Sequence, residues 1–367
     1  MSSEEKQIKT KINKLTKLID FHNQQYHTYD KPVISDAEFD DLYNQLKLLE
    51  KKYPKFLSKE SPTQRVGEKL RGGFQKIEHT IPMLSLSNAL SEDNFSDFYK
   101  KILEKYNDKK IIFFAEPKFD GLAVSIEYKN GMLMNATTRG DGFIGEDITS
   151  NVKTIKSLPF KLTGKVPKNL LLRGEIYIDK SDFNKLNKTL SKNNEKTYSN
   201  PRNFAAGTIR QLDPKITASR NLKIFIHGVA NIDKDYHLES HSSLMNRVKK
   251  MNFRICELGS TVASLTEACR YYEKIRKKRD KLPYEIDGVV YKIDNIKRQK
   301  ELGYTSKAPK WSIAYKFESL SVLTLLKQVT FQVGRTGTIT PVAELNKANI
   351  GGVTISRATL HNMDEIN

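Results

Sequence analysis

The first part of the chain carries the pattern of two amphipathic helices joined by a polar loop. Apolar side chains recur there every three or four positions, which is the period of a helix with one buried face. The two apolar stripes are Ile8, Ile12, Leu15 and Ile19, and then Phe39, Leu42, Leu46 and Leu49. Ser35 and Glu38 stand before the second stripe at the spacing of a capping box. Tyr53-Pro54 predicts the end of that helix, because a proline disfavours helical geometry in the residue before it.

From about residue 74 the pattern changes to short apolar runs that are typical of strands. Strands are predicted at 111–115, 122–128, 132–134, 170–173, 224–229 and 289–293, and helices at 181–190 and 265–281. Asn130-Gly131 predicts a tight hairpin turn between two of the strands. Because strand pairs and helices mix without a regular β-α-β alternation, this segment is predicted to be an α+β domain with antiparallel sheets.

The last part of the chain returns to a strand pattern. Strands are predicted at 322–333, 340–345 and 353–359, with a turn at 335–338. These are typical of the opening strands of a small β-barrel. We expect the strands up to residue 367 to be too few to close such a barrel. We therefore expect an α+β protein of three domains: a helical module at 1–72, the main domain at 73–318 and the start of a barrel at 319–367.

The composition excludes several classes of protein. No run approaches the roughly 18 uncharged apolar residues of a membrane span, and the charged start Met1–Lys6 does not resemble a signal peptide. Cys256 and Cys269 are the two cysteines of the chain, too few for a disulfide framework or a four-cysteine zinc site. We therefore expect a soluble chain in the reducing cytoplasm.

The charge points to a polyanionic partner without identifying one. The chain has 62 Lys and Arg against 43 Asp and Glu, a net charge of +19. Such a surplus favours association with nucleic acid. A lysine-rich composition with no polyanionic partner would give the same number, so both interpretations stay open at this point.

Lys118 is the first candidate for chemistry. It follows an apolar run, in the sequence Glu116-Pro117-Lys118-Phe119-Asp120-Gly121. At the edge of a buried sheet, desolvation and neighbouring cations favour the neutral amine, which is a nucleophile. The Lys-x-Asp-Gly pattern alone fits an ordinary surface turn equally well.

Further charged segments follow Lys118 in order. They are Arg139–Gly142, Arg173–Glu175, Asn200–Gln211, Asp287–Lys292 and Trp311–Phe317. Each holds a charged residue at a predicted strand end or in a glycine-rich turn, where cations and backbone N–H groups can face a phosphate. One such segment alone would be a solvated turn, but their appearance in this order does not arise by chance.

This ordered set resembles the nucleotidyltransferase core of polynucleotide ligases and mRNA capping enzymes. The N-terminal residues Tyr26-His27, Asp36, Phe39 and Asp40 resemble the small domain peculiar to the NAD+-dependent DNA ligases of bacteria. The segments Glu60–Gly67 and Pro82–Asn88 resemble two further phrases of that family. The resemblance covers the whole chain, and it implies a helical module, an ATP-grasp-like adenylation domain and an incomplete OB-fold barrel.

The resemblance also implies roles for individual residues. Lys118 would attack the α-phosphorus of NAD+, expel nicotinamide mononucleotide (NMN) and hold AMP as a phosphoramidate. The residues implied around the nucleotide are Ser85, Leu86, Glu116, Asp120, Gly121, Arg139, Glu175, His227, Lys292 and Lys316. The residues implied in the NMN clamp are Tyr26, His27, Asp36, Phe39 and Asp40, and those implied in nick recognition are Arg202 and Arg210.

Within this set, Lys292 and Lys316 would approach the adenine and the α-phosphate. Glu175 would lie near a Mg²⁺ or Mn²⁺ ion. Cations of this kind stabilise the charge that grows on the equatorial oxygens of a pentavalent phosphorus. Zinc is expected only in family modules that lie beyond this chain.

Three departures from the family are visible. Phe39 replaces the usual Tyr, so stacking on NMN would survive without the phenolic hydrogen bond. His227 replaces a Tyr that stacks on adenine, and both a stacking imidazole and a half-buried strand histidine fit the sequence. The family continues beyond residue 367 through the rest of the OB barrel, a zinc module, helix-hairpin-helix motifs and a BRCT domain. We therefore expect self-adenylylation with little or no nick sealing.

The expected partner is nicked double-stranded DNA, and we expect a monomer in the bacterial cytoplasm, associated with the nucleoid through DNA. Two alternatives remain at this point. A relative that uses ATP or GTP would share the later motifs, although the helical module argues against it. A catalytically silent DNA-binding derivative would share the charge, although the intact lysines and Glu175 argue against that interpretation.

Overall fold

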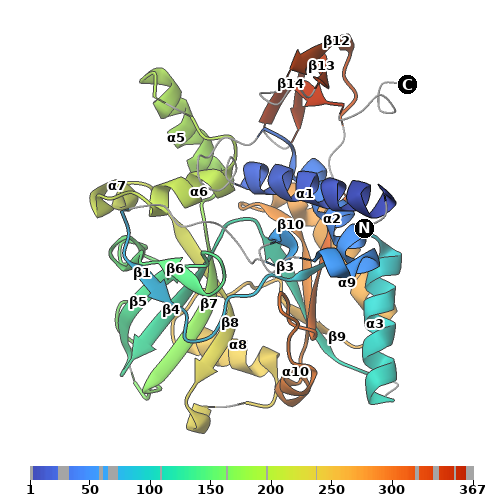
Figure 1. The fold of residues 1–367 in the computed structure, drawn as a ribbon. Helices are drawn as coiled ribbons and strands as arrows, with labels where there is room; N and C mark the ends of the chain where they lie inside the picture. Colours follow the sequence, from blue (N-terminus) through green and yellow to red (C-terminus); the bar gives the residue numbers. More distant parts are fainter. Residues whose placement is uncertain are drawn as a thin grey trace. The chain divides into compact units, whose positions relative to one another are not determined.

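The computed structural model describes residues 3–23, 33–57, 61–64, 73–107, 110–162, 164–195, 197–236, 238–318, 322–333, 339–350 and 353–360. The chain divides into two compact units. The larger unit comprises Met1–Val33 and Phe39–Phe317, and the smaller comprises Ile34–Glu38 and Glu318–Asn367. Helices and antiparallel sheets are mixed throughout (Figure 1), which confirms the α+β class.

The two predicted N-terminal helices are present. They are α1 (Ser3–Asn23) and α2 (Asp36–Lys52), followed by 3-10 turns at Pro54–Phe56 and Pro62–Gln64. The apolar stripes face inward, with Ile12, Leu15, Ile19, Leu42 and Leu46 buried. The capping box also forms, because the Ser35 backbone N–H donates to the Glu38 carboxylate at 2.7 Å and the Glu38 N–H donates to the Ser35 hydroxyl at 3.3 Å.

A five-stranded sheet carries much of the candidate site. Its strand order is β2 (Ser87–Ala89), β11 (Ser312–Lys316), β10 (Ile286–Ile293), β3 (Phe113–Phe119) and β9 (Ser260–Val262). All neighbours are antiparallel except β2 and β11, which are parallel, an exception to the antiparallel prediction. The sheet buries its core against α3 (Glu92–Tyr106) and α9 (Leu265–Lys278), and α10 (Ile296–Leu302) follows β10. The 3-10 turn Arg279–Lys281 replaces the last turn of the predicted helix 265–281.

A four-stranded antiparallel sheet forms the second layer of the larger unit. Its order is β5 (Met132–Thr138), β4 (Leu122–Lys129), β7 (Asn169–Tyr177) and β8 (Lys223–Ile232). Asn130 and Gly131 have φ of 50° and 76°, so the predicted hairpin turn is confirmed. The helices of this part are α4 (Thr149–Val152), α5 (Lys180–Lys192), α6 (Pro201–Ile209), α7 (Pro214–Ala218) and α8 (His241–Lys250). A separate two-stranded ribbon of β1 (Lys76–Glu78) and β6 (Ile144–Glu146) contacts the end of β5, where the Glu146 N–H donates to the Thr138 hydroxyl at 3.0 Å. A 3-10 turn spans Lys234–Tyr236.

The smaller unit contains a three-stranded antiparallel sheet. Its strands are β12 (Leu326–Val333), β13 (Ile339–Ile350) and β14 (Val353–Thr359). The prediction for 353–359 is confirmed, whereas the strand predicted from residue 322 begins only at Leu326, where pairing with Leu345 starts. The predicted turn at 335–338 lies outside the described residues.

Two predictions about strand ends were wrong. The strand predicted to stop before Lys118 continues to Phe119, and Glu175 lies inside β7, which runs to Tyr177. In both places the neighbouring strands continue the hydrogen-bonded ladder, since Lys118 pairs with Gly288 and Glu175 pairs with Ala123 and Phe225. The two charged side chains are therefore held by rigid sheet rather than by turns. None of the described helices is long and apolar enough to cross a membrane.

Candidate active site

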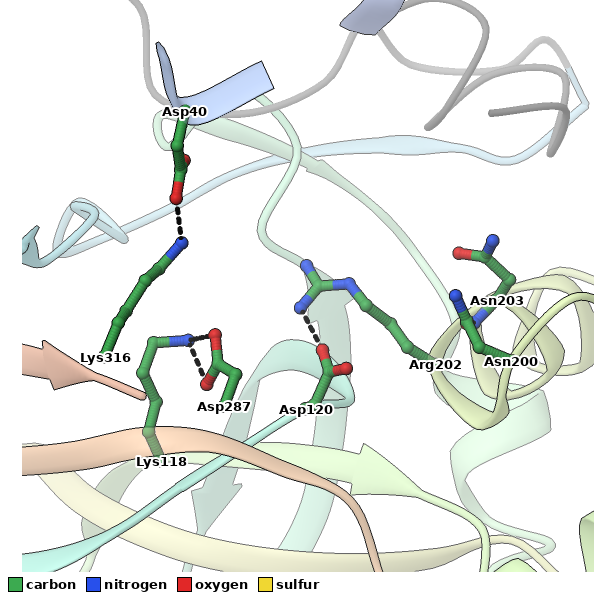
Figure 2. A network of polar contacts seen from close by, with 8 residues as sticks. All are labelled: Asp40, Lys118, Asp120, Asn200, Arg202, Asn203, Asp287 and Lys316. Carbon is green, nitrogen blue, oxygen red and sulfur yellow. Dashed lines mark hydrogen bonds and ion pairs between the residues drawn. The ribbon is translucent and has the colours of Figure 1, made fainter. Parts of the chain in front are cut away.

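Lys118 lies at the centre of the candidate site, near the end of β3. Its ammonium donates hydrogen bonds of 2.8 Å to both carboxylate oxygens of Asp287. Asp287 occupies a bulge at the start of β10, where the register with β3 shifts between Ile286 and Gly288. A bulge re-aims one side chain out of the regular alternation, and here it directs Asp287 at Lys118 (Figure 2).

Asp287 is a site residue that is not among those predicted from the sequence. Of the charged segment Asp287–Lys292, only Lys292 is predicted to approach the nucleotide. The signal available in the sequence is the pair Asp287-Gly288, which repeats the pair Asp120-Gly121 that follows Lys118. The glycine is required, because a Cβ at Gly288 would lie 2.4 Å from the Tyr315 carbonyl oxygen.

An arginine from α6 approaches the same centre. Asn200 caps this helix by accepting from the Asn203 N–H at 2.8 Å, and Pro201 occupies its first turn. This fixes the start of α6, from which Arg202 donates to Asp120 at 2.9 Å. Figure 2 shows Arg202 reaching from α6 toward the loop that follows Lys118.

Glu175 enters the site from β7. Burial raises the pKa of the Glu175 carboxyl to about 7, while the cations Arg202, Lys118 and Arg139 act in the opposite direction. These three cations are therefore close enough to Glu175 to influence its charge. Gly121 allows the close approach of β4 to β7, since a Cβ there would lie 2.3 Å from the Ile176 oxygen and 3.0 Å from Glu175 Cγ.

A second lysine at the site is paired with the helical module. Lys316 at the end of β11 donates to Asp40 of α2 at 2.5 Å. Both side chains belong to the larger unit, and the pair lies beside Lys118 and Asp287 in Figure 2. The contact brings a residue of the predicted NMN clamp to a lysine predicted to approach the α-phosphate.

A buried polar cluster lies further along the same strands. Lys292 donates to Glu116 and to the His227 carbonyl oxygen, each at 2.6 Å. Glu116 and Lys292 are 3% and 6% exposed. Burial raises the pKa of Glu116, an effect that the Lys292 ammonium opposes.

Two neutral imidazoles adjoin this cluster. Burial lowers the pKa of His227 to about 3, and the Lys292 and Arg173 cations contribute. Burial also lowers the pKa of His241 well below its ordinary value, and its Nε2 has no hydrogen-bond partner among the described residues. The cluster therefore contains the Glu116–Lys292 ion pair beside two uncharged rings, with the Arg173 cation also near His227, and these rings suit an uncharged heterocycle.

Most of the chain matches the family model described as "NAD-dependent DNA ligase adenylation domain", over residues 71–320. The chain belongs to the NAD-dependent DNA ligase family. Residues 5–67 match the family's N-terminal NAD+-binding domain, and residues 323–367 match its OB-fold domain.

Curated relatives named DNA ligase agree with this membership. The chain is 47% identical to the protein of Marinomonas sp. (strain MWYL1), over 93% of this chain and 51% of that one. It is 45% identical to the protein of Hahella chejuensis (strain KCTC 2396), over 98% and 53%. The chain thus spans about half the length of the curated relatives it matches. A solved structure titled "Pmar-Lig_Pre." has a TM-score of 0.41 at 12% identity, over 86% of this chain and 59% of that one, too distant to support a conclusion.

The other residues predicted from the ligase family lie on separate elements. Ser85 and Leu86 are half-buried just before β2. Arg139 begins the turn before β6, and its carbonyl oxygen contacts His79 Nε2 at 3.1 Å. Phe39 is half-buried on α2, with its ring stacked 6.5 Å from that of Tyr43. Tyr26, His27 and the side chain of Asp36 lie outside the described residues.

Arg210, predicted to contact the nick, is placed in the interior of this ligase-family domain. Its guanidinium donates to Glu146 at 2.7 Å, and the two side chains are only 6% and 1% exposed. Glu146 belongs to β6, so the pair ties this short ribbon to the end of α6. The structure therefore brings together Lys118, Asp120, Glu175, Arg202, Lys316 and Asp40, and it holds Arg210 against a different partner.

Proposed function

We propose that this chain transfers AMP from NAD+ to Lys118, as the first step of DNA ligation. In the later steps of ligation, the AMP would pass to the 5′-phosphate of a nick, and the 3′-hydroxyl would then displace it to seal the strand. The observation that carries the proposal is the placement of a lysine amine on rigid sheet, with Asp287, Glu175, Arg202 and Lys316 directed at the same region.

The first step needs a neutral amine. Lys118 Nζ forms a bond to the α-phosphorus, the bond from that phosphorus to the bridging oxygen breaks, and NMN leaves with the oxygen. The amine must also lose a proton, and Asp287 is hydrogen-bonded to Nζ through both carboxylate oxygens. Asp287 is thus positioned to orient the amine and to accept its proton.

Charge on the phosphate would be met by cations at the site. Lys316 takes the role of contacting the α-phosphate after its pairing with Asp40 is exchanged for the substrate, and Arg139 is a further proposed cation. Glu175 is the proposed oxygen donor to Mg²⁺ or Mn²⁺, hard cations that use one or two carboxylates together with substrate phosphates. Such an ion would withdraw charge from the phosphate oxygens.

The buried cluster of Glu116, Lys292 and His227 is the proposed adenine pocket, closed by Ser85 and Leu86. Its neutral imidazoles and single ion pair support binding of an uncharged base with specific polar contacts. His227, neutral at physiological pH, would stack on that base as the family's Tyr does.

The helical module is the proposed binding site for NMN. Tyr26, His27, Asp36, Phe39 and Asp40 form the proposed clamp, and the contact of Asp40 with Lys316 supports its nearness to the reacting phosphate. Phe39 retains an aromatic face but offers no hydroxyl. NAD+ binding is therefore expected to be weaker than a Tyr at this position would give.

Nicked duplex DNA is the proposed partner, and the net charge of +19 is consistent with it. Arg202 is the proposed nick-side arginine, and Arg210 contributes by fixing the end of α6 through Glu146.

We propose domains at 1–72, 73–318 and 319–367, supported by the ranges of the three family matches. We further propose that the protein is a monomer that associates with the bacterial nucleoid through DNA.

Incubation with NAD+ and Mg²⁺ tests the proposal. We expect the intact protein to gain the mass of one AMP, with ATP failing as donor, and Lys118→Ala to gain none. Lys118→Arg is the matched control, because it keeps a cation beside Asp287 while removing the nucleophilic amine. Labelling of either variant would show that another residue is the nucleophile, and labelling by ATP alone would exclude NAD+ as the donor.

A further inference from the structure

Helix α5 (Lys180–Lys192) projects from the four-stranded sheet beside α6 (Figure 1). Its apolar side chains Phe183, Leu186 and Leu190 pack against the core of that sheet. The Phe183 ring meets that of Phe204 of α6 edge-on, with centroids 5.9 Å apart. One face of α5 is therefore used for anchoring to the helix that carries Arg202.

The opposite face of α5 carries a row of lysines. Lys185, Lys188 and Lys192 are all exposed. At 3.6 residues per turn, the three fall within an arc of about 60° and extend about 10 Å along the helix axis. We call this row the α5 lysine face.

The α5 lysine face is not neutralised by nearby acids in the part of the chain that the structure describes. None of its three ammonium groups has a hydrogen bond or ion pair with a described residue. The neighbouring acids are engaged elsewhere: Asp179 with Lys223, Asp182 with Asn221 at 2.6 Å, and Glu195 with Asn193 at 3.1 Å. A positive strip of this kind is complementary to a linear polyanion.

The helix is also held rigidly enough to present these charges. The Asn187 side chain donates to the Tyr198 carbonyl at 2.8 Å and accepts from the Tyr198 N–H at 2.9 Å. These bonds join α5 to the segment that leads into α6. The α5 lysine face and Arg202 are therefore carried by one fastened pair of helices, and Arg202 of α6 contacts Asp120, which lies two residues after Lys118.

We propose that the α5 lysine face binds the phosphate backbone of duplex DNA beside the nick. One DNA strand presents a phosphate about every 3.4 Å along its axis, so a strip of about 10 Å can meet several phosphates. Lysine ammonium groups contact phosphates as point charges without reading sequence. The inference rests on the proposed function, which makes nicked DNA the substrate.

The test replaces all three lysines with glutamine in the full chain. Glutamine is a comparable helix former, so the exposed helix should remain intact, which thermal unfolding can check. The matched control is Lys100→Gln, Lys101→Gln and Lys105→Gln on α3. These lysines are also exposed, on a helix at the other side of the larger unit in Figure 1. Affinity for a fluorescent nicked duplex is measured by anisotropy at several salt concentrations, and lysyl-AMP formation from NAD+ is measured in parallel.

We expect the α5 variant to bind DNA at least about tenfold more weakly at 0.1 M salt, with the slope of log K against log salt shallower by about 2 to 3. Lysyl-AMP formation should be unchanged, and the α3 control should bind like the parent. An unchanged slope in the α5 variant, or an equal change in the α3 control, would overturn the proposal. The proposal would also be overturned if the parent protein did not bind the nicked duplex at all. DNA binding that depends on the α5 lysines, without formation of lysyl-AMP, would support the α5 proposal and contradict the proposed function.

Discussion

Both carboxylate oxygens of Asp287 accept a hydrogen bond of 2.8 Å from Lys118, although the two residues are far apart in sequence. The β-bulge at Asp287 makes this geometry possible, because regular pairing would place the residue in the alternation of β10. The nucleophile and its proposed proton acceptor are thus fixed by adjacent strands of one sheet. This arrangement leads to the first prediction.

Asp287→Asn should slow adenylylation without unfolding the protein. The amide keeps the size of the carboxylate but loses its charge, and hydrogen bonds to charged groups contribute about 1.5–3 kcal/mol, or about ten- to a hundredfold in rate. Single-turnover incorporation of AMP from NAD+ measures the effect. Asp235→Asn, at an exposed position, is the control. A rate equal to that of the parent would remove Asp287 from the mechanism.

Lys292→Met should destabilise the fold through Glu116. The substitution leaves a buried carboxylate without its counterion, which costs about 3–5 kcal/mol when the group stays charged. Burial already raises the pKa of Glu116, and loss of Lys292 removes the cation that opposes this rise. The loss of stability should therefore grow as pH rises. The unpaired Glu116 carboxyl must either ionise while buried or keep a proton that it releases in the unfolded chain.

Urea unfolding at pH 5.5 and pH 8 measures this cost. The double variant Glu116→Gln/Lys292→Met is the control, since a neutral amide needs no counterion. It should recover much of the lost stability at the higher pH. Equal stability of the single and double variants at pH 8 would show that the Glu116–Lys292 pair is not a coupled unit.

Glu175 should make folding stability depend on pH. Its pKa in the folded protein, about 7, lies above the ordinary value of 4.5. Between these values the folded state holds a proton that the unfolded state has lost, so stability falls as pH rises from about 4.5 to about 7 and then levels off. Comparing urea unfolding of the parent and Glu175→Gln at pH 5, 6, 7 and 8 isolates this contribution. A constant difference between the two proteins would mean that Glu175 titrates at its ordinary pKa.

Phe39→Tyr should strengthen NAD+ binding. The new hydroxyl would supply one hydrogen bond to the leaving mononucleotide, which contributes about 0.5–1.5 kcal/mol, or about two- to tenfold in the NAD+ concentration for half-maximal rate. Titration of AMP incorporation against NAD+ gives this value. Phe21→Tyr, on an exposed part of α1, adds the same hydroxyl elsewhere and should change nothing. Equal behaviour of the two variants would place Phe39 away from the bound dinucleotide.

The helices could be predicted from sequence because their signals are local. The stripe from Ile8 to Ile19 and the capping box of Ser35 and Glu38 each lie within one helix, and both are found in the structure. The hairpin at Asn130-Gly131 was predictable for the same reason, since both residues adopt the left-handed conformation that the turn requires.

Strand ends and pairing partners were harder to predict because they depend on distant residues. Lys118 and Glu175 look like turn residues by charge, yet the neighbouring strands extend the ladder past both. The parallel pairing of β2 with β11 depends on where two remote segments meet. The partnership of Arg210 with Glu146 is likewise a tertiary contact, and no periodicity along the chain indicates it.

The central claim, that Lys118 is the residue adenylylated by NAD+, is tested most directly by mass spectrometry of the purified chain. After incubation with NAD+ and Mg²⁺, we predict one added AMP per protein, and fragmentation of the digested peptide should locate it on Lys118. An added AMP on any other residue, or no addition under conditions in which the protein remains folded, would contradict the account.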